Sequence, residues 1–367
     1  MKKILYLTVA DSVHDQRFMQ TLAESDYGAY ALRVRSGDWP TPAGVQAISP
    51  LGFDFPLSEA DFPAFTGKLG EILETIKPDL VQAGPLYDLA YLAAMAGART
   101  LLAQSWGFDL MAESFANTQN LSRTKFVLAQ AQGLIVDAHC SAEKAISLGV
   151  DVKKIYDFPW GIDLEHFDRS AWAMDASKIR KELGWENAKV LFCLRSWESK
   201  YGVIDLCKAF VMAAAINPGL RLLLVGTGSQ VSEIESIFKT AQLEDKVKVL
   251  GKLRNAELPK YFAAADIYVS PSHVDGSSVS LMEALASSLP ALVTDIPANL
   301  EWVRDGVNGW IFRDGNIDDL TQKILFAAKA HLEPMQLAAR QTAVDKADWQ
   351  KNKQVLLKAW HDLLEKA

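Results

Sequence analysis

The sequence predicts an α/β protein of two domains, each built on a parallel β-sheet that helices cover on both faces. Short apolar runs rich in Val, Ile and Leu alternate with longer stretches of helical periodicity, and continuously apolar strands are typical of parallel sheets. The alternation occurs twice, on either side of a polar seam at residues 161–176. The length of 367 residues also suits about two domains of ~100–200 residues each.

The strands follow from the apolar runs and the helices from the stretches between them. The predicted strands of the first half are Ile4–Val9, Leu80–Gln82, Thr100–Gln104, Gly133–Val136 and Lys154–Phe158. Those of the second half are Val190–Leu194, Arg221–Val225, Val247–Leu250, Ile267–Ser270 and Ala291–Thr294. The helices expected between them are Arg17–Glu24, Leu89–Met95, Ser141–Leu148, Val203–Ile216, Ser232–Ala241, Glu257–Ala264 and Ser280–Ser287.

The C-terminal part of the chain reads as helical over Ile317–Ala330, Pro334–Val344 and Trp349–Glu365. Apolar positions in the last of these recur at spacings of three and four, which predicts one buried face. We therefore expect a first domain at residues 1–165, a second at 166–345, and a final helix at 346–367 that packs back on the first domain.

Composition narrows the classes of function. The 38 Lys and Arg against 45 Asp and Glu give a net charge of −7, which argues against a nucleic-acid partner because such proteins usually present a basic face. The three cysteines form neither an even set nor a Cys-x-x-Cys pair, which suits a reducing cytoplasm better than a disulfide scaffold or a zinc site. No run approaches the ~18 apolar residues of a spanning helix.

The most informative segment is residues 266–290, which predicts a strand, a loop of small residues and a helix. The loop Gly276-Ser277-Ser278 would expose backbone N–H groups at a helix N-terminus, where the macrodipole favours an anion. Glu283 lies about one turn inside that helix and could accept hydrogen bonds from a diol, while Asp275 would meet another part of the same ligand. The alternative is a capped helix with ordinary surface acids.

A second segment places two cations in a loop that follows a predicted strand. Arg195 and Lys200 are five residues apart after Val190–Leu194, and ligands of open parallel sheets bind at the carboxyl ends of the strands. Two cations there suit a diphosphate and the charge that develops on it as a leaving group. The alternative is a solvated pair of basic residues.

The third segment, Leu222–Gly228, carries a Gly-x-Gly after a strand. The third glycine of the dinucleotide fingerprint is absent, since Val231 stands there, so the motif is weak evidence for NAD. We interpret Gly226 and Gly228 as a tight turn that lets a nucleotide approach.

The second half of the chain resembles the retaining GT-B glycosyltransferases of family 4. The family's Gly-Arg-Leu…Lys-Gly, Val-Gly-x-Gly and Glu-x7-Glu motifs look like residues 194–202, 225–228 and 275–283 here, with Asp275 in place of the first Glu. In the first half, residues 12–17, 82–85, 105–110 and 159–163 are similar to segments of one branch of the family, more loosely.

The resemblance implies two Rossmann-like domains facing a central cleft, with a nucleotide sugar held mainly by the second domain. It implies that Arg195 and Lys200 bind the diphosphate, that Glu283 binds the ribose and that Asp275 touches the donor sugar. The same resemblance implies that the amides of Ser277–Val279 approach the phosphate. The remaining donor-side residues are Gly276, Gly226, Gly228, Lys252 and Leu253, the last two lying beside the base.

On the acceptor side the family often has a His near the positions of Gln82 or Trp106, and neither is His here. His14 and Asp109 are the other polar candidates in these loops, with Arg17 one helical turn from His14. We count Asp109 among the catalytic candidates, although capping the next helix is an equal explanation. A structural role is likewise the alternative for His14.

These observations predict a retaining glycosyltransferase that uses a UDP- or GDP-linked sugar and a carbohydrate or lipid-linked hydroxyl acceptor, in polysaccharide, glycolipid or glycoconjugate synthesis. The resemblance implies that no metal is needed, and no Asp-x-Asp motif occurs.

Residues 1–160 carry 13 Lys and Arg against 18 Asp and Glu, a net of −5. We therefore expect a cytoplasmic protein with at most weak peripheral contact with the inner face of the membrane. One alternative is a catalytically weak donor-binding subunit of a partner transferase, and another is an NAD-dependent oxidoreductase.

Overall fold

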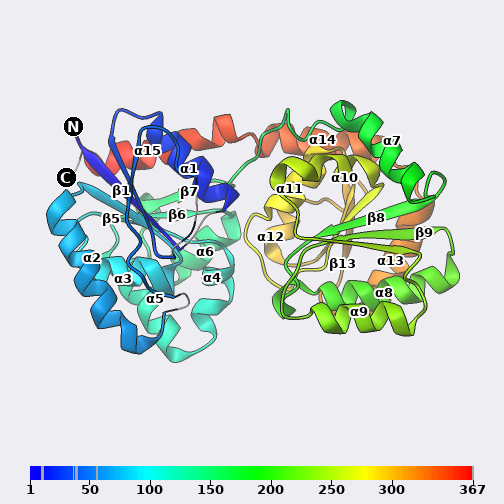
Figure 1. The fold of residues 1–367 in the computed structure, drawn as a ribbon, viewed down its shortest axis with the longest axis horizontal. Coiled ribbons are helices and arrows are strands. Elements are labelled where there is room, and N and C mark those ends of the chain that lie inside the picture. Colours follow the sequence, from blue (N-terminus) through cyan, green and yellow to red (C-terminus); the bar gives the residue numbers. More distant parts are fainter. Residues whose placement is uncertain (10–11, 36, 38–39, 55–56, 366–367) are drawn as a thin grey trace. The chain divides into compact units, whose positions relative to one another are not determined.

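The computed structural model describes residues 1–9, 12–35, 37, 40–54 and 57–365. The chain divides into two compact units (Figure 1). The first unit comprises residues 1–160 and 350–367, and the second unit comprises residues 161–349. These limits fall at 160/161 and 349/350, against the predicted 165/166 and 345/346.

The first unit is built on a seven-stranded parallel sheet in the order β3-β2-β1-β4-β5-β6-β7. The chain moves outward from β1 to β3 and then returns to β4, so the order reverses between β1 and β4, where open α/β sheets place their ligands. The strands are β1 (Lys3–Thr8), β2 (Gly28–Arg33), β3 (Val45–Ile48), β4 (Leu80–Ala83), β5 (Leu101–Gln104), β6 (Gly133–Val136) and β7 (Ile155–Asp157).

A core of Leu, Val and Ala lies between several helices of the first unit and one face of its sheet, the face that carries Leu5, Val81, Leu101 and Leu134. The longer ones are α1 (Val13–Ala23), α2 (Phe62–Ile76), α5 (Thr118–Gln130), α6 (His139–Ser147) and α15 (Trp349–Leu364). The shorter ones are η1 (Glu59–Asp61), the π-helical η2 (Leu86–Ala90), α3 (Tyr91–Met95), α4 (Phe108–Met111), η3 (Glu113–Phe115) and η4 (Val152–Lys154).

The final helix α15 returns to the first unit and packs by the face that its periodicity predicts. Leu356, Trp360, Leu363 and Leu364 are all buried. The Trp360 indole N–H donates to Gln82 Oε1 of β4 at 2.8 Å, so a polar contact fixes this helix on the sheet in addition to apolar packing.

The second unit has a six-stranded parallel sheet in the order β10-β9-β8-β11-β12-β13. Its order reverses between β8 and β11, as the first sheet's does between β1 and β4. The strands are β8 (Lys189–Leu194), β9 (Leu220–Val225), β10 (Val247–Gly251), β11 (Ile267–Ser270), β12 (Ala291–Thr294) and β13 (Gly309–Phe312).

The helices of the second unit cover both faces of its sheet (Figure 1). The longer ones are α7 (Ala173–Glu182), α8 (Val203–Ile216), α9 (Val231–Thr240), α11 (Val279–Ala286), α13 (Ile317–Lys329) and α14 (Glu333–Lys346). The shorter ones are η5 (Arg169–Trp172), η6 (Ser199–Tyr201), η7 (Asn255–Glu257), α10 (Leu258–Ala264) and α12 (Pro297–Leu300). In the described part of the chain no helix combines the length and apolar character that a membrane span requires.

The predicted fold class, two Rossmann-like domains with parallel sheets, is confirmed. The ten predicted strands all occur, and three further strands were not predicted. β2 is rich in small residues, β3 is a half-exposed edge strand, and β13 begins at a glycine. That glycine is required by packing, because a Cβ on Gly309 would lie 2.0 Å from the carbonyl oxygen of Ala291 on β12.

Candidate functional site

The carboxyl edge of the second sheet gathers the loops that follow β8, β9 and β11. Since these strands are parallel, their carboxyl ends lie at one edge of the sheet. The structure thereby brings Arg195, from the loop after β8, against Asp275 and Ser278, from the loop after β11. Three residues of the predicted donor site are thus in direct contact.

Arg195 is held on several sides. Its Nη2 donates to Asp275 Oδ2 at 2.5 Å, and its Nη1 donates to Ser278 Oγ at 2.6 Å and more weakly to Ser280 Oγ at 3.4 Å. The guanidinium carbon lies 4.3 Å from the centre of the Tyr201 ring. The two charged side chains are only 9% and 14% exposed, so the guanidinium is fixed before any ligand arrives.

The electrostatics of this ion pair reflect its burial. Burial raises the pKa of the Asp275 carboxyl, while Arg195, the Gly276 N–H and the Ser278 hydroxyl oppose that shift. Burial also acts to lower the pKa of Arg195, but the neighbouring Asp275 more than offsets it and the pKa is raised. The charged form of each side chain is therefore stabilised by the charge of the other.

Lys200 lies in the short helix η6, which ends directly before Gly202. Its carbonyl oxygen accepts a hydrogen bond from the His273 backbone N–H at 3.0 Å. Gly202 has a φ of +60°, and a Cβ there would lie 2.1 Å from the Pro271 carbonyl oxygen. Only glycine fits, so the turn that carries Lys200 is pressed against the loop after β11.

His273, to which the sequence assigned no role, connects three segments of this edge. Its Nδ1 lies 2.6 Å from Asp314 Oδ1 and its Nε2 lies 3.8 Å from Asp205 Oδ2 of α8. Because its backbone also binds Lys200, the residue ties the lysine turn to the segment before α13.

Glu283 is 3% exposed on α11. Its Oε1 accepts a hydrogen bond from Asn255 Nδ2 of η7 at 3.1 Å. Asn255 was not predicted as part of a site, because an isolated Asn in a loop carries no motif. Lys252 is exposed and Leu253 half-buried in the segment between β10 and η7.

Gly226 and Gly228 follow β9, and their small size has a structural cause. A Cβ on Gly226 would lie 2.0 Å from the Arg195 carbonyl oxygen, and one on Gly228 would lie 2.4 Å from that of Trp197. Trp197 is 2% exposed, and its indole Nε1 has no acceptor among the described residues. The two glycines let the loop after β9 pack directly on the Arg195 loop, which sequence alone did not indicate.

In the first unit, Asp109 organises the loops after β4 and β5. It is fully buried and accepts hydrogen bonds from the Ser105 hydroxyl at 2.6 Å, the Trp106 N–H at 2.9 Å and the Leu86 N–H at 2.8 Å. Burial raises the pKa of its carboxyl, and these hydrogen bonds oppose the shift. The structure thus places Asp109, predicted as a catalytic candidate, at the centre of a set of protein donors.

Gln82 is also fully buried. Its Nε2 donates to Gln104 Oε1 at 2.7 Å, and its Oε1 accepts from the Trp360 indole. Both ends of the amide are engaged between β4, β5 and α15, so this acceptor-side candidate lies inside the sheet packing.

Two other acceptor-side candidates, His14 and Trp106, meet Trp160 in an aromatic group at the carboxyl edge of the first sheet. His14 lies in the first turn of α1, Trp106 follows β5 and Trp160 follows β7. The ring centres lie 5.7 Å apart for His14 and Trp106, 6.1 Å for His14 and Trp160, and 5.9 Å for the two tryptophans. Burial, and then the charge of half-buried Arg17, lower the pKa of His14 to about 3, so its imidazole is neutral at physiological pH.

A neighbouring acidic group was missed by sequence reasoning. The Tyr87 hydroxyl donates to Glu113 Oε2, and Asp88 lies next to it in the π-helical turn η2. Burial raises the pKa of Asp88 to about 6, Arg123 opposes the shift and Glu113 adds to it. π-Helical turns are frequent at functional sites, but the lone acids in residues 87–113 form no spacing that a sequence search would detect.

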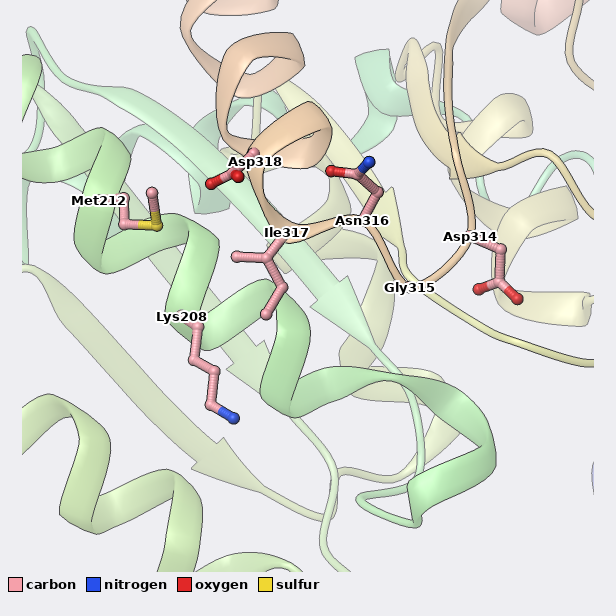
Figure 2. A pocket seen from close by; sticks show the side chains of 7 residues that line it. All are labelled: Lys208, Met212, Asp314, Gly315, Asn316, Ile317 and Asp318. Atoms are coloured by element: carbon pink, nitrogen blue, oxygen red, sulfur yellow. The ribbon is translucent and has the colours of Figure 1, made fainter.

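A hollow elsewhere on the second unit lies between α8 and the start of α13 (Figure 2). Lys208 is its only cation among the lining residues and shares it with Asp314 and Asp318, while Asn316 already caps the first turn of α13. This hollow lacks the paired cations of the Arg195 loop.

Within the described residues, no three His, Cys, Asp or Glu side chains are grouped so as to hold a metal ion.

Two doubly wound parallel sheets, the second with a charged strand–loop–helix edge, are the architecture of the GT-B fold. Residues 175–343 match the family described as "Glycosyl transferases group 1". This match lies within the second unit and confirms the resemblance drawn from the motifs there.

Relatives of established identity match parts of the chain. The alpha-monoglucosyldiacylglycerol synthase of Acholeplasma laidlawii is 28% identical over 178 residues, which make up 44% of this chain and 45% of the relative. The N-acetyl-alpha-D-glucosaminyl L-malate synthase of Bacillus anthracis is 27% identical over 266 residues, 69% of this chain and 66% of the relative. This chain thus covers less than two thirds of the length of either relative.

Similarity of fold extends over the whole chain. The crystal structure of Anabaena HepE, solved in complex with UDP and glucose, aligns with a TM-score of 0.81 at 19% identity. The alignment covers 99% of this chain and 100% of the HepE chain. At this identity the likeness establishes the fold, including the first unit, which the family match does not reach.

Proposed function

We propose that the protein is a glycosyltransferase that moves a sugar from a nucleoside-diphosphate sugar to a hydroxyl acceptor. The observation that carries the proposal is the fixed guanidinium of Arg195, held beside the Lys200 turn and the start of α11 at one sheet edge. A diphosphate leaving group gains charge as the glycosidic bond breaks, and preorganised cations stabilise that charge in the transition state.

The residues that we propose to bind the nucleotide sugar lie at the same sheet edge. Arg195 and Lys200 would bind the diphosphate, the amides of residues 276–279 at the start of α11 would face a phosphate oxygen, and buried Glu283 would accept hydrogen bonds from the ribose. The loop of Lys252 and Leu253 would lie beside the base. UDP is our first choice of nucleotide because HepE is described in complex with UDP, and GDP is the second.

We further propose that the reaction retains the anomeric configuration and needs no metal. A departing phosphate oxygen can take the proton of the acceptor hydroxyl on the same face of the sugar, so no protein nucleophile is required. Arg195 and Lys200 supply the positive charge that a metal supplies in other enzymes. The configuration of the product, read by NMR, tests the first statement, and activity in a chelator tests the second.

On the acceptor side, the half-buried Trp106 and the neutral His14 offer a ring face and an uncharged hydrogen-bonding group at the carboxyl edge of the first sheet. With Arg17 one helical turn away, they are the residues we propose to meet the acceptor. The names of the two relatives refer to a diacylglycerol and to malate. We therefore keep the acceptor class broad, as a carbohydrate or lipid-linked hydroxyl compound.

The location that we propose is the cytoplasm, with at most weak peripheral contact with the membrane. Cys140, Cys193 and Cys207 are all free and buried, which suits a reducing compartment. The net charge of −5 on residues 1–160 disfavours adhesion to an anionic lipid surface.

The test begins with thermal shifts of the purified protein in UDP, GDP, ADP and TDP, because a ligand that binds the native state raises Tm. Hydrolysis and transfer are then measured with sugars linked to the nucleotide that binds. We expect turnover in the wild type and its loss in Lys200→Ala. Nucleotide binding without hydrolysis or transfer of any sugar would contradict the enzymatic proposal and favour a donor-binding subunit.

A further inference from the structure

One aromatic ring lies beside both cations of the proposed diphosphate site. The guanidinium carbon of Arg195 lies 4.3 Å from the centre of the Tyr201 ring, and Lys200 Nζ lies 5.5 Å from the same centre. We propose that Tyr201 is a positioning residue whose ring holds the two cations together for a nucleoside diphosphate. This inference rests on the proposed function, because it assigns a role within that donor site.

The attraction between the ring and the cations is electrostatic. The face of an aromatic ring carries partial negative charge and attracts cations within about 6 Å of its centre. Arg195 and Lys200 are like charges and repel each other when they are brought to one ligand. Arg195 already has one carboxylate partner, Asp275. The ring offsets the remaining repulsion without a second carboxylate, which would also repel the phosphates.

The ring contact leaves the hydrogen-bonding capacity of Arg195 intact. Asp275 and Ser278 accept hydrogen bonds from Nη2 and Nη1 of the guanidinium. The contact with the Tyr201 ring needs no hydrogen bond, so it fixes the cation without using an N–H donor that a phosphate oxygen could engage.

The Tyr201 ring is itself held in place. Tyr201 is half-buried and packs against the apolar core of the second unit. Its N–H donates to the Glu198 carbonyl oxygen at 2.9 Å, and the Glu198 carboxylate accepts from the N–H and the hydroxyl of Ser229, at 2.9 Å and 2.5 Å. The turn is thereby joined to the loop after β9, and the ring can serve as a fixed support for the cations.

The experiment changes the electrostatics of the ring while its shape is kept. Tyr201 is replaced by phenylalanine and by phenylalanines with increasing numbers of ring fluorines, which withdraw negative charge from the ring face. Calorimetry gives the Kd of each protein for UDP, or for GDP if the wild type binds GDP. We expect Tyr201→Phe to bind within about twofold of the wild type, each fluorination to weaken binding, and Tyr201→Leu to weaken it roughly tenfold.

A second ligand separates this role from a merely structural one. The nucleoside without phosphates, uridine or guanosine, does not depend on the two cations. We therefore expect the whole series, including Tyr201→Leu, to bind the nucleoside with the Kd of the wild type.

The matched control is Tyr261→Leu. Tyr261 also follows a lysine, and Lys260 Nζ lies 5.3 Å from the centre of its ring. It is likewise half-buried and belongs to the second unit, but it lies in α10 rather than in the Arg195 loop. We expect this variant to bind UDP as the wild type does.

Three results would overturn the inference separately from the proposed function. If the Kd for UDP is constant through the fluorinated series, the ring acts by shape alone. If Tyr201→Phe loses as much affinity as Tyr201→Leu, the hydroxyl carries the effect. If Tyr201→Leu weakens the nucleoside as much as the diphosphate, or Tyr261→Leu weakens UDP equally, the loss is general destabilisation. If the wild type binds neither UDP nor GDP, the proposed function itself fails, and this inference fails with it.

Discussion

The carboxyl edges of the two sheets are built on the same plan but differ in charge. In each, an aspartate follows a strand and fastens the loop there: Asp275, 14% exposed, in the second unit and the fully buried Asp109 in the first. Asp275 is paired with the cation Arg195, whereas Asp109 is held by a hydroxyl and two backbone N–H groups. One edge therefore fixes a positive charge, and the other fixes a neutral loop that carries Trp106.

The comparison shows how one topology can carry two kinds of loop chemistry. Parallel strands present their loops at one edge whatever the sequence, so the fold supplies the place and the loop residues supply the chemistry. Fixed cations suit a diphosphate, while a neutral imidazole and an indole face suit an uncharged hydroxyl compound. The predictions below test this contrast between a charged and a neutral edge.

The largest effect is expected at the charged edge. Lys200→Ala should lower kcat for transfer by about 10²–10³-fold, the scale for removal of one preorganised group that stabilises transition-state charge. The free energy of unfolding should change by less than ~0.5 kcal/mol, as for most surface substitutions. Exposed Lys208 on α8 provides the control, and a Lys208→Ala variant that lost as much activity would show that general positive charge, not the Lys200 position, matters.

The second prediction concerns Glu283, at the same edge, where we expect a smaller effect, seen as a loss of nucleotide affinity. Glu283→Gln is expected to weaken nucleotide binding by roughly 1–3 kcal/mol, the range of a hydrogen bond to a charged group. Calorimetric titration of UDP or GDP measures the change. Glu257→Gln, which alters an acid paired with exposed Arg254 nearby in η7, serves as control. An unaltered Kd in Glu283→Gln would rule out the proposed contact of Glu283 with the ribose.

At the neutral edge, Asp88→Asn should stabilise the protein. The pKa of Asp88 is raised to about 6 mainly by burial, so between the ordinary value near 4 and pH 6 the native state binds more protons than the unfolded state. The stabilisation that protonated Asp88 contributes is therefore present at low pH and lost as pH rises through that window. We expect a gain of roughly 1–2 kcal/mol at pH 7 in urea unfolding, and none at pH 3.5. A loss of stability at pH 7 would show that Arg123 holds the ionised form.

The smallest effect concerns His14, whose pKa is lowered to about 3 by burial and by Arg17. Here the unfolded state binds more protons between pH 3 and 6.5, so stability falls as pH drops through the unfolded pKa. Between pH 8 and pH 6 this contributes about 1 kcal/mol. His14→Asn should remove that slope in thermal unfolding. An unchanged slope would mean that the native pKa of His14 is close to its pKa in the unfolded state.

Sequence predicted the fold better than the sites, for reasons seen in particular residues. Apolar runs such as Ile267–Ser270 coincide with a strand because a parallel strand is buried on both faces. α2 was missed because Pro63, Gly67 and Gly70 interrupt its pattern, although its buried Phe65 and Leu69 fix it on the sheet.

Sites depend on contacts between distant segments. The spacing of Arg195 and Asp275 in sequence gave no sign that they touch, and Gly228 could not be assigned to packing on Trp197 without coordinates. Motifs therefore indicated which loops matter, while the partner of each side chain required the structure.

The segments that enter and leave the second unit are paired with each other. Ile162 and Asp348 form a parallel bridge, with Ile162 N–H bound to the Ala347 carbonyl and Trp349 N–H bound to that of Ile162. The second unit is in this sense a domain inserted into the first, with its two ends side by side. Closing the first unit across such adjacent ends costs little chain entropy. Residues 161–349 should therefore fold autonomously, and a short linker should rejoin residues 160 and 350.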